Sequence, residues 1–444
     1  MANRSQTLML NKAVGAMLGA ACGDALGWPN ERVGRSYKDE SKPQGPLLEF
    51  TKWTRRSGGR YYPHDEIIDA GSYSDDTQLI LCLSRSLRCG PRWWDQFSRI
   101  ELPFWALYER GGGGATKRSV DAWTDGVPPW SDKRTSNDVK RYFEAGGNGV
   151  AMRILPHVLI NTDISDFAPL ARNIMLDGIV THGHPRALVG ALAYGYALWK
   201  SIRRTEQLGF GEMVEDLLGN ASEWETIPET SVAADDWIKA ASNHIPGYQN
   251  MWKSAVKEMI DLLETCKKEL SKGALTSDKE TLRALQCFDQ KISGAGTVAA
   301  GAAVFLASRY APDPINGLTT AAHAVGADTD TIASMTGGLL GTFSGMEWLA
   351  SLKDQVQDSK YLVKIATDLV SKGESTGLPD IQDVRRSNLN RWVDELSEMK
   401  SGATCELPDG RRGSIVSRSE RVGKSGKFKV IFHRIACEDG QNLY

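Results

Sequence analysis

The sequence predicts a largely α-helical protein that ends in a small β module. Several long segments place apolar residues at positions i, i+3, i+4 and i+7, which is the spacing of a buried helix face. Alternation of apolar and polar residues, the pattern of a half-buried strand, is almost absent before residue 400. Beyond Lys400, short runs rich in Val, Ile and Phe flank turn-forming residues, and this pattern predicts strands.

Helices are predicted along most of the first 400 residues. The clearest five are residues 10–27, 77–88, 184–202, 251–270 and 296–310. Residues 13–28 follow Arg4 and Lys12, as the apolar core of a signal peptide would, but Asp24 and its flanking glycines interrupt the apolar run. We therefore expect a buried helix there. No run approaches the roughly 20 apolar residues that a membrane-spanning helix needs.

The segments between these helices are of two kinds. Connections rich in Gly, Pro and charged residues are predicted to be surface loops: residues 57–67, 109–119 and 124–134. Residues 205–292 combine a polar, aromatic stretch with an amphipathic helix, and we expect a solvent-facing elaboration of the helical body. In the β module, residues 401–444, Asp409-Gly410 predicts a turn and residues 417–426 a longer loop. The module has the size of an SH3-like barrel, which is one arrangement open to it.

Length, charge and cysteine usage limit the class of protein. A chain of 444 residues can bury a large core, and a formal net charge of −2 gives no overall field that attracts nucleic acid or membranes. The seven cysteines are scattered without a CxxC pair, which indicates reduced core thiols and a cytoplasmic protein. The β module is mildly basic, with 8 Lys/Arg against 5 Asp/Glu. A nucleic-acid or protein partner is one interpretation of this balance, and a structural or oligomerisation role is equally open.

Two clusters of acidic and hydroxyl residues carry the strongest chemical signal. Ser74 to Thr77 reads Ser-Asp-Asp-Thr, Asp328 to Thr331 reads Asp-Thr-Asp-Thr, and each stands directly before an apolar segment. One such residue can cap a helix, but neighbouring carboxylates repel one another unless a cation or proton intervenes. Each cluster alone is explained equally well by a helix cap with a solvated acid. As a pair, the clusters favour a set of oxygen ligands for Mg²⁺ or Mn²⁺.

Four further motifs were weighed against simpler structural explanations. Glu31 is an additional carboxylate just beyond a glycine-rich helix end. Residues 144–156 form a Gly/Asn loop whose backbone N–H groups can approach a phosphate closely, although Gly-Asn-Gly is also an ordinary turn. His182 and His184 precede a predicted helix, where capping or hydrogen bonding is favoured over a metal site. Gly294 to Ala299 matches a loose GxGxxA pattern, but the polar, helical segment before it argues against a dinucleotide-binding unit.

In this order, the motifs GDALGxxxE, SDDT, GNGxAMRxxP, THxxP and GADTDTIA resemble the ADP-ribosylglycohydrolase family, the group that contains the enzyme which reactivates dinitrogenase reductase. The resemblance covers about Leu10 to Ser351. It implies an all-α orthogonal helical bundle with a binuclear Mg²⁺ or Mn²⁺ site at one end of the core. The domain organisation is then a helical domain over residues 1–400, with residues 205–292 as an elaboration, followed by the β module.

The resemblance also implies roles for individual residues. Two divalent cations would take their ligands from both clusters, namely Ser74, Asp75, Asp76, Asp328, Asp330 and Thr331. Ser74 stands where many members have Thr, which keeps the hydroxyl donor. The catalytic carboxylates would be Glu31, Asp75 and Asp76, with Glu31 gating the site or activating water. ADP-ribose would contact the glycine loop and the motif histidine, namely Gly146, Gly147, Asn148, Gly149, Met152, Arg153 and His182.

These features predict a divalent-metal-dependent hydrolase that cleaves the C1″ glycosidic bond of ADP-ribose through an oxocarbenium-like transition state. The expected substrate is an ADP-ribosylated macromolecule or an ADP-ribose derivative, and no membrane partner is expected. The alternative is a non-catalytic ADP-ribose-binding or structural protein on the same fold. A pure binder would be free to lose Asp75, Asp328 or Asp330, so their presence favours the enzyme.

Overall fold

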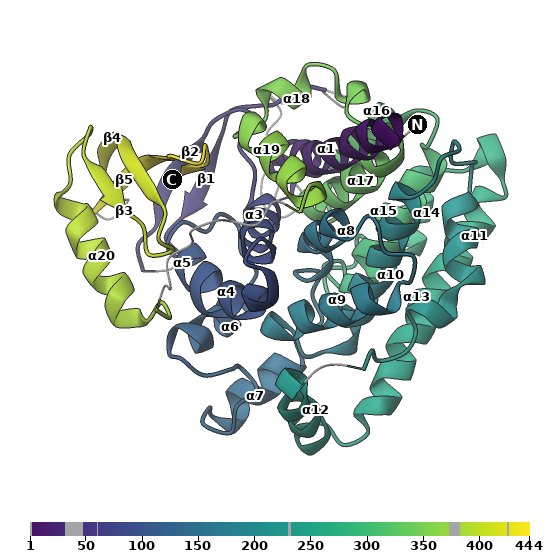
Figure 1. The fold of residues 1–444 in the computed structure, drawn as a ribbon, viewed down its shortest axis with the longest axis horizontal. Helices are drawn as coiled ribbons and strands as arrows, with labels where there is room; N and C mark the ends of the chain where they lie inside the picture. Colours follow the sequence, from purple (N-terminus) through teal and green to yellow (C-terminus); the bar gives the residue numbers. More distant parts are fainter. Residues whose placement is uncertain (1, 32–47, 60, 230–231, 373–381, 424–425) are drawn as a thin grey trace.

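The computed structural model describes residues 2–31, 48–59, 61–229, 232–372, 382–423 and 426–444. Figure 1 shows a broad body of helices with a small β sheet at one edge, next to a short hairpin. This architecture confirms the predicted fold class of a helical protein with a C-terminal β module. Within the described ranges, no helix is long and apolar enough to cross a membrane.

Helices account for nearly all of the regular secondary structure that is described before residue 400. In chain order they are α1 (Ala2–Gly27), α3 (Asp75–Leu87), α4 (Trp93–Gln96), α5 (Leu102–Trp105), α6 (Gly114–Thr124), α7 (Ser136–Phe143), α8 (Leu155–Ile160), α9 (Ala168–Thr181), α10 (Pro185–Ile202), α11 (Glu212–Gly219), α12 (Val232–His244), α13 (Tyr248–Leu270), α14 (Asp278–Ala284), α15 (Gly296–Arg309), α16 (Pro314–Ala322), α17 (Thr329–Ser344), α18 (Leu352–Gln355), α19 (Ser359–Val370) and α20 (Arg386–Glu398). All five predicted helices are present, as α1, α3, α10, α13 and α15. The expected buried helix at the N-terminus is α1.

The backbones of α1 and α17 lie in direct contact along an antiparallel seam. On α1 the seam consists of glycines one helical turn apart, namely Gly15, Gly19, Gly23 and Gly27. A Cβ atom at Gly19 would lie 2.3 Å from the carbonyl oxygen of Gly337, and one at Gly23 would lie 2.1 Å from that of Ala333. Any side chain here would therefore push the two helices apart, and the seam fixes the register between them.

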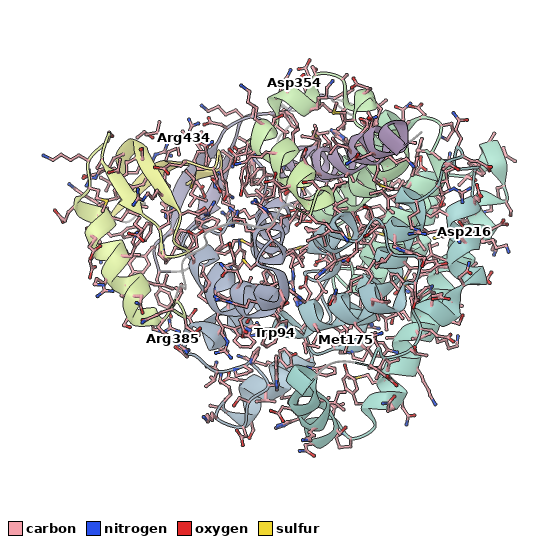
Figure 2. All side chains as sticks on the ribbon, viewed as in Figure 1. Trp94, Met175, Asp216, Asp354, Arg385 and Arg434 are labelled. Carbon is pink, nitrogen blue, oxygen red and sulfur yellow. The ribbon has the colours of Figure 1, made fainter. Side chains whose placement is uncertain are left out.

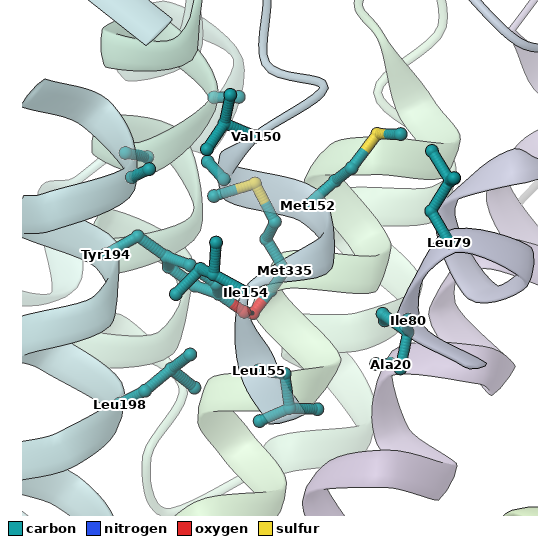
Figure 3. Packing of buried hydrophobic residues seen from close by; sticks show 14 of the residues in the cluster. Ala20, Leu79, Ile80, Val150, Met152, Ile154, Leu155, Tyr194, Leu198 and Met335 are labelled. Atoms are coloured by element: carbon teal, nitrogen blue, oxygen red, sulfur yellow. Dashed lines mark hydrogen bonds between the residues drawn. The ribbon is translucent and has the colours of Figure 1, made fainter. Parts of the chain in front are cut away.

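Apolar side chains from helices far apart in the sequence meet beside this seam. Figure 3 shows Leu79 of α3, Leu155 of α8 and Met335 of α17 turned toward a common core, and all three are at most 1% exposed. Tyr194 of α10 closes the group, because its hydroxyl donates to the carbonyl oxygen of Met335 at 2.9 Å. All seven cysteines are free, and six of them are buried, as expected for reduced core thiols.

The segment predicted as a solvent-facing elaboration, residues 205–292, is only partly exposed. It forms α11 to α14, and α13 packs against α10 and α15. The side chains of Trp224, Trp237 and Met259 are each at most 1% exposed. The solvent-facing prediction is therefore wrong for these residues, because the aromatic side chains in the polar stretch fold inward. Its status as an elaboration of the family fold stays a prediction.

Two of the three predicted surface loops contain regular structure. Within residues 57–67, β2 (His64–Ile68) pairs antiparallel with β1 (Trp53–Ser57), so the loop prediction is wrong for the second strand. Five-residue strands with one exposed face are too short for a clear alternation signal. Within residues 109–119, α6 begins at Gly114. Residues 125–134 contain neither helix nor strand, as predicted.

The β module is a four-stranded antiparallel sheet in the order β3-β4-β5-β6. Its strands are β3 (Thr404–Glu406), β4 (Arg412–Val422), β5 (Lys429–Cys437) and β6 (Asn442–Leu443). Asp409-Gly410 lies in the turn between β3 and β4, as predicted, and Gly410 has a positive φ of 82°. The predicted loop over residues 417–426 is wrong in its first half, because β4 continues to Val422, which pairs with Lys429.

The sheet is docked on the helical body through polar contacts. The backbone N–H of Asn442 donates to the carboxylate of Asp358 at 3.1 Å, and the Tyr73 hydroxyl donates to the same carboxylate at 2.7 Å. Arg85 of α3 forms a buried ion pair with Glu101 at 2.7 Å and also donates to Gln441 at 2.9 Å. The division into residues 1–400 and 401–444 stays a prediction.

We expect Gly19→Ala to destabilise the fold by about 1–3 kcal/mol or more, because its Cβ would overlap the backbone of α17. Helix propensity alone predicts the opposite sign, a gain of about 1 kcal/mol. Urea denaturation monitored by circular dichroism distinguishes the two. The matched control is Gly219→Ala on α11, where a Cβ meets nothing within 4 Å and a small gain is expected. Equal stability of both variants would contradict the seam.

Candidate active site

The two acidic clusters meet at one end of the α1–α17 seam. α3 begins at Asp75 and α17 at Thr329, so both clusters occupy the first turns of helices. Thr329 donates its hydroxyl hydrogen to the carbonyl oxygen of Gly27, the last residue of α1, at 2.8 Å. Across the gap, the Thr331 hydroxyl donates to Asp76 Oδ2 at 3.3 Å. The structure thus brings together clusters that are some 250 residues apart in the chain.

Asp24 of α1 holds the first cluster in position, and the sequence analysis missed this role. Its carboxylate accepts the backbone N–H of Ser74 at 2.9 Å and that of Thr77 at 3.0 Å. It also accepts the Thr77 hydroxyl at 2.6 Å. Asp24 is completely buried. The available signal was a single carboxylate inside an otherwise apolar helix, which a buried fold tolerates only with hydrogen-bond partners.

Capping accounts for one residue of the first cluster and leaves its carboxylates unexplained. Ser74 is the N-cap of α3, and its hydroxyl oxygen accepts the backbone N–H of Asp76 at 3.4 Å. Asp24 satisfies further N–H groups of the same helix start. Neither Asp75 nor the side chain of Asp76 is needed as a cap. Both are nonetheless buried, at 6% and 2% exposure.

The carboxylates of both clusters share an unfavourable electrostatic environment. Burial raises the pKa of Asp75, Asp76 and Asp330 well above the usual range of an aspartate. Neighbouring negative charges raise these pKa values further, and Glu31 and Asp328 act on both Asp75 and Asp330. The charge of Glu31 therefore acts on both clusters, and its catalytic role stays a prediction. A divalent cation among these groups would relieve their repulsion.

The residues present have the right donor chemistry for Mg²⁺ or Mn²⁺. All of the candidate ligands offer oxygen atoms, which these cations prefer. Asp76 Oδ1 is buried and has no hydrogen-bond partner within the described residues, so it is an orphaned acceptor beside Asp330. Over the described part of the chain, however, no group of three or more His, Cys, Asp or Glu side chains is already arranged to hold a metal ion. The carboxylates converge without forming a closed ligand set.

The predicted glycine loop lies directly beside the second cluster. The backbone N–H of Asn148 donates to the carbonyl oxygen of Gly294 at 2.9 Å, and that of Gly296 donates to Gly146 at 3.1 Å. The Asn148 side chain donates to Asp328 Oδ2 at 2.9 Å. The Gly294–Gly296 turn, which the sequence analysis rejected as a dinucleotide site, therefore serves to hold this loop. It leads into α15 with no strand before it, which agrees with that rejection.

His182 and Arg153 support the loop from inside the protein. A Cβ at Gly149 would lie 2.9 Å from His182 Cε1, so the loop rests on the imidazole. Arg153 is completely buried; it pairs with Asp177 at 2.6 Å and donates to the carbonyl oxygen of Gly149 at 2.5 Å. Met152 is also buried, at 4% exposure. This burial favours a positioning role for Arg153 and Met152 over direct contact with a ligand.

Burial also fixes the protonation state of His182. It lowers the pKa of the imidazole to about 3, with the positive charges of Arg153 and Arg118 contributing. His182 Nδ1 shares a hydrogen bond with the Thr181 hydroxyl at 2.8 Å. A neutral imidazole therefore lies under the loop near neutral pH.

A second missed segment closes the other side of the site. Gly111, in a stretch predicted as a surface loop, has a φ of 105°, and a Cβ there would lie 2.9 Å from Asp75 Oδ1. Nearby, Glu109 pairs with Lys117 at 2.9 Å and accepts the backbone N–H of Gly112 at 2.8 Å. The run of four glycines was the signal, because close backbone approach to a functional group is a common use of glycine.

Comparison with known proteins agrees with this geometry. The family model for "ADP-ribosylglycohydrolase" matches residues 5–379. The fold is similar to that of a solved structure described as an "ADP-ribosylglycohydrolase-related protein complex", with 19% identity, a TM-score of 0.50, and coverage of 82% of this chain and 99% of that chain. At this identity the likeness concerns the fold alone. No curated protein matches the sequence significantly.

We expect the contribution of His182 to stability to fall as the pH drops below about 6.5, the usual pKa of histidine, while the raised pKa values of Asp75, Asp76 and Asp330 act in the opposite direction. The folded pKa of His182, about 3, lies below the unfolded value, so the unfolded chain binds the proton first. Each pH unit below 6.5 then costs about 1.4 kcal/mol for this residue. His184, with its pKa lowered to about 4, adds a similar contribution.

Urea denaturation at several pH values measures this slope. His182→Gln should reduce this slope by about one proton. An identical slope in the wild type and His182→Gln would show that the imidazole is not held neutral.

Proposed function

Because the chain belongs to the ADP-ribosylglycohydrolase family, we propose that it is a divalent-metal-dependent hydrolase that removes ADP-ribose from a modified acceptor. The observation that carries this proposal is the meeting of two buried acidic clusters, which share a hydrogen bond from Thr331 to Asp76 at 3.3 Å. Uncompensated buried carboxylates are costly to a fold, so their retention favours a functional role.

The candidate cation ligands are the six residues of the two clusters, namely Ser74, Asp75, Asp76, Asp328, Asp330 and Thr331. When bound, such cations polarise a water molecule and orient the ribose hydroxyls. The orphaned Asp76 Oδ1 supports this assignment. The Asn148 side chain, which donates to Asp328, would hold that carboxylate in one orientation.

The reaction itself requires a base for the attacking water and a binding site for the diphosphate. Glu31, Asp75 and Asp76 are the candidate bases; one of them accepts the proton as water attacks C1″ and the bond to the acceptor breaks. The backbone N–H groups of Gly146, Gly147 and Gly149 would face the diphosphate. His182, neutral and buried, keeps the loop at a fixed distance from the clusters.

A non-catalytic ADP-ribose binder is the second candidate function. The glycine loop beside the second cluster supports it, because backbone N–H groups of such a loop can bind a diphosphate without any hydrolysis. Calorimetry with ADP-ribose separates the two: tight binding without turnover of any ADP-ribosylated substrate supports the binder. Membership of the dinitrogenase-reductase-activating type and a cytoplasmic location both stay predictions.

We expect Asp75→Asn and Asp76→Asn each to reduce metal-dependent release of ADP-ribose by a factor of about 10² or more. The fold should survive, because each change removes one of several repelling buried charges. The assay compares ADP-ribosylated arginine, serine and nucleic-acid substrates with Mg²⁺, with Mn²⁺ and with EDTA. No metal-dependent release from any substrate would count against the proposed function.

A thermal readout tests metal binding independently of turnover. Saturating Mg²⁺ should raise the Tm of the wild type by preferential binding to the folded state, and Asp76→Asn should lose this shift. The matched control is Asp236→Asn on α12, whose carboxylate is 88% exposed and lies in neither cluster. A control variant that also loses the shift would show that the effect is nonspecific. If Asp76→Asn fails to fold, the cluster has a structural role instead.

A further inference from the structure

Positive charge is concentrated on one part of the β module. All eight Lys and Arg residues after Ser401 lie between Arg411 and Arg434, a stretch with Glu420 as its single acid. Arg411 is turned toward the body, where it pairs with Asp409 at 2.6 Å and Asp439 at 3.0 Å. The remaining basic residues that the structure describes belong to the β4–β5 hairpin, and Figure 2 shows Arg434 at the outer edge of the molecule.

Exposed aromatic rings lie next to this basic hairpin. Tyr61 and Tyr62, in the turn between β1 and β2, are 80% and 62% exposed. The ring of Tyr62 contacts Phe428 at 5.3 Å, and Arg421 of β4 donates to the backbone oxygen of Asp65 at 2.9 Å. The β1–β2 turn and the β4–β5 hairpin therefore form one surface, which we call the ribbon face (Figure 1).

A cavity of about 380 Å³ lies between the ribbon face and the helical body. Its walls combine aromatic and basic side chains, including Phe104, Trp392, Phe432, Tyr444, Arg55 and Arg110. Arg55 and Arg110 share one carboxylate, that of Glu66, at 3.4 Å and 3.1 Å. Neither Nε atom has a hydrogen-bond partner in the described part of the chain. Glu66 is therefore shared by two guanidinium groups, and the second acidic residue of the lining, Glu109, pairs with Lys117.

The cavity adjoins the candidate active site. Glu109 and Arg110 line it, and Gly111 follows directly, with its backbone packed against Asp75. A ligand in this cavity would contact Arg110, and the next residue, Gly111, packs against Asp75 of the first acidic cluster.

We propose that the ribbon face binds single-stranded nucleic acid, with one base in the adjoining cavity. Lys and Arg side chains of the β4–β5 hairpin pair with phosphates, and the exposed tyrosines stack on unpaired bases. An acidic peptide would satisfy the charge but would leave the aromatic turn and the aromatic cavity without planar partners. A duplex would hide the faces of its bases. This inference rests on the proposed function: if the protein is a hydrolase, its substrate class is an ADP-ribosylated nucleic-acid strand.

Fluorescence anisotropy with the full chain tests the binding. The probes are labelled DNA and RNA single strands of about 12 nucleotides, within the range that such grooves cover. Tyr61→Ala should weaken binding about tenfold. The double variant Lys429→Glu/Arg434→Glu should weaken binding further. It should also lower the slope of log affinity against log salt concentration by about two, one for each lost phosphate contact. All three side chains are exposed, so the fold should be unaffected.

Matched controls are available on α13 and in the connection from α13 to α14, helices that Figure 1 shows at the opposite edge of the molecule from the β sheet. Leu275→Ala removes another large apolar side chain, 86% exposed, and Lys257→Glu on α13 reverses another charge, 75% exposed. Both should bind like the wild type. Equal effects of control and ribbon-face variants, equal affinity for a duplex, or preference for a polyglutamate probe would each overturn the proposal.

The experiment separates this inference from the proposed function. Release of ADP-ribose from a small ADP-ribosylated arginine substrate should be unchanged in the ribbon-face variants, while release from a modified strand should fall with binding. Strand binding without hydrolysis of any substrate would defeat the proposed function and leave the binding surface intact. Hydrolysis of a substrate without any strand binding would support the proposed function and defeat the proposed binding surface.

Discussion

The direct contact between the α1 and α17 backbones is the constraint on which the candidate site depends. Four glycines, one per turn of α1, let the two helices approach until main-chain atoms touch. This contact fixes the last turn of α1 against the first turn of α17. Asp24, on that last turn of α1, binds the N-terminus of α3. Two short-range interactions thus set the relative position of three helix ends, and with them both acidic clusters.

Much of this arrangement could be predicted from the sequence because residues close together in the chain determine it. Helical periodicity located α1, α3, α10, α13 and α15, and the turn at Asp409-Gly410 located the first corner of the sheet. The two Asp-rich stretches stood out because each carries more carboxylates than a helix cap uses. Family motifs then related Glu31 and the Asn148 loop to those clusters.

Long-range pairings escaped the sequence analysis for a physical reason. Asp24 stands out locally only as a lone carboxylate in an apolar helix, and its partners Ser74 and Thr77 lie on another element about 50 residues along the chain. The prediction of a loop at Gly111 is correct for its backbone, but it gives no information about the contact with Asp75. Trp224 and Trp237 were assigned to a solvent-facing segment because polar neighbours mask the inward direction of their side chains.

Asp358 has a consequence for how the protein unfolds. One carboxylate accepts hydrogen bonds from Tyr73, which immediately precedes the first acidic cluster, and from Asn442 at the edge of the C-terminal sheet. Loss of the sheet would therefore leave a half-buried charge with fewer partners beside the cluster. We therefore expect the sheet and the acidic site to unfold together, with their slowest amide hydrogens exchanging at the same rate. Local opening at the sheet edge is thereby coupled to order at the site.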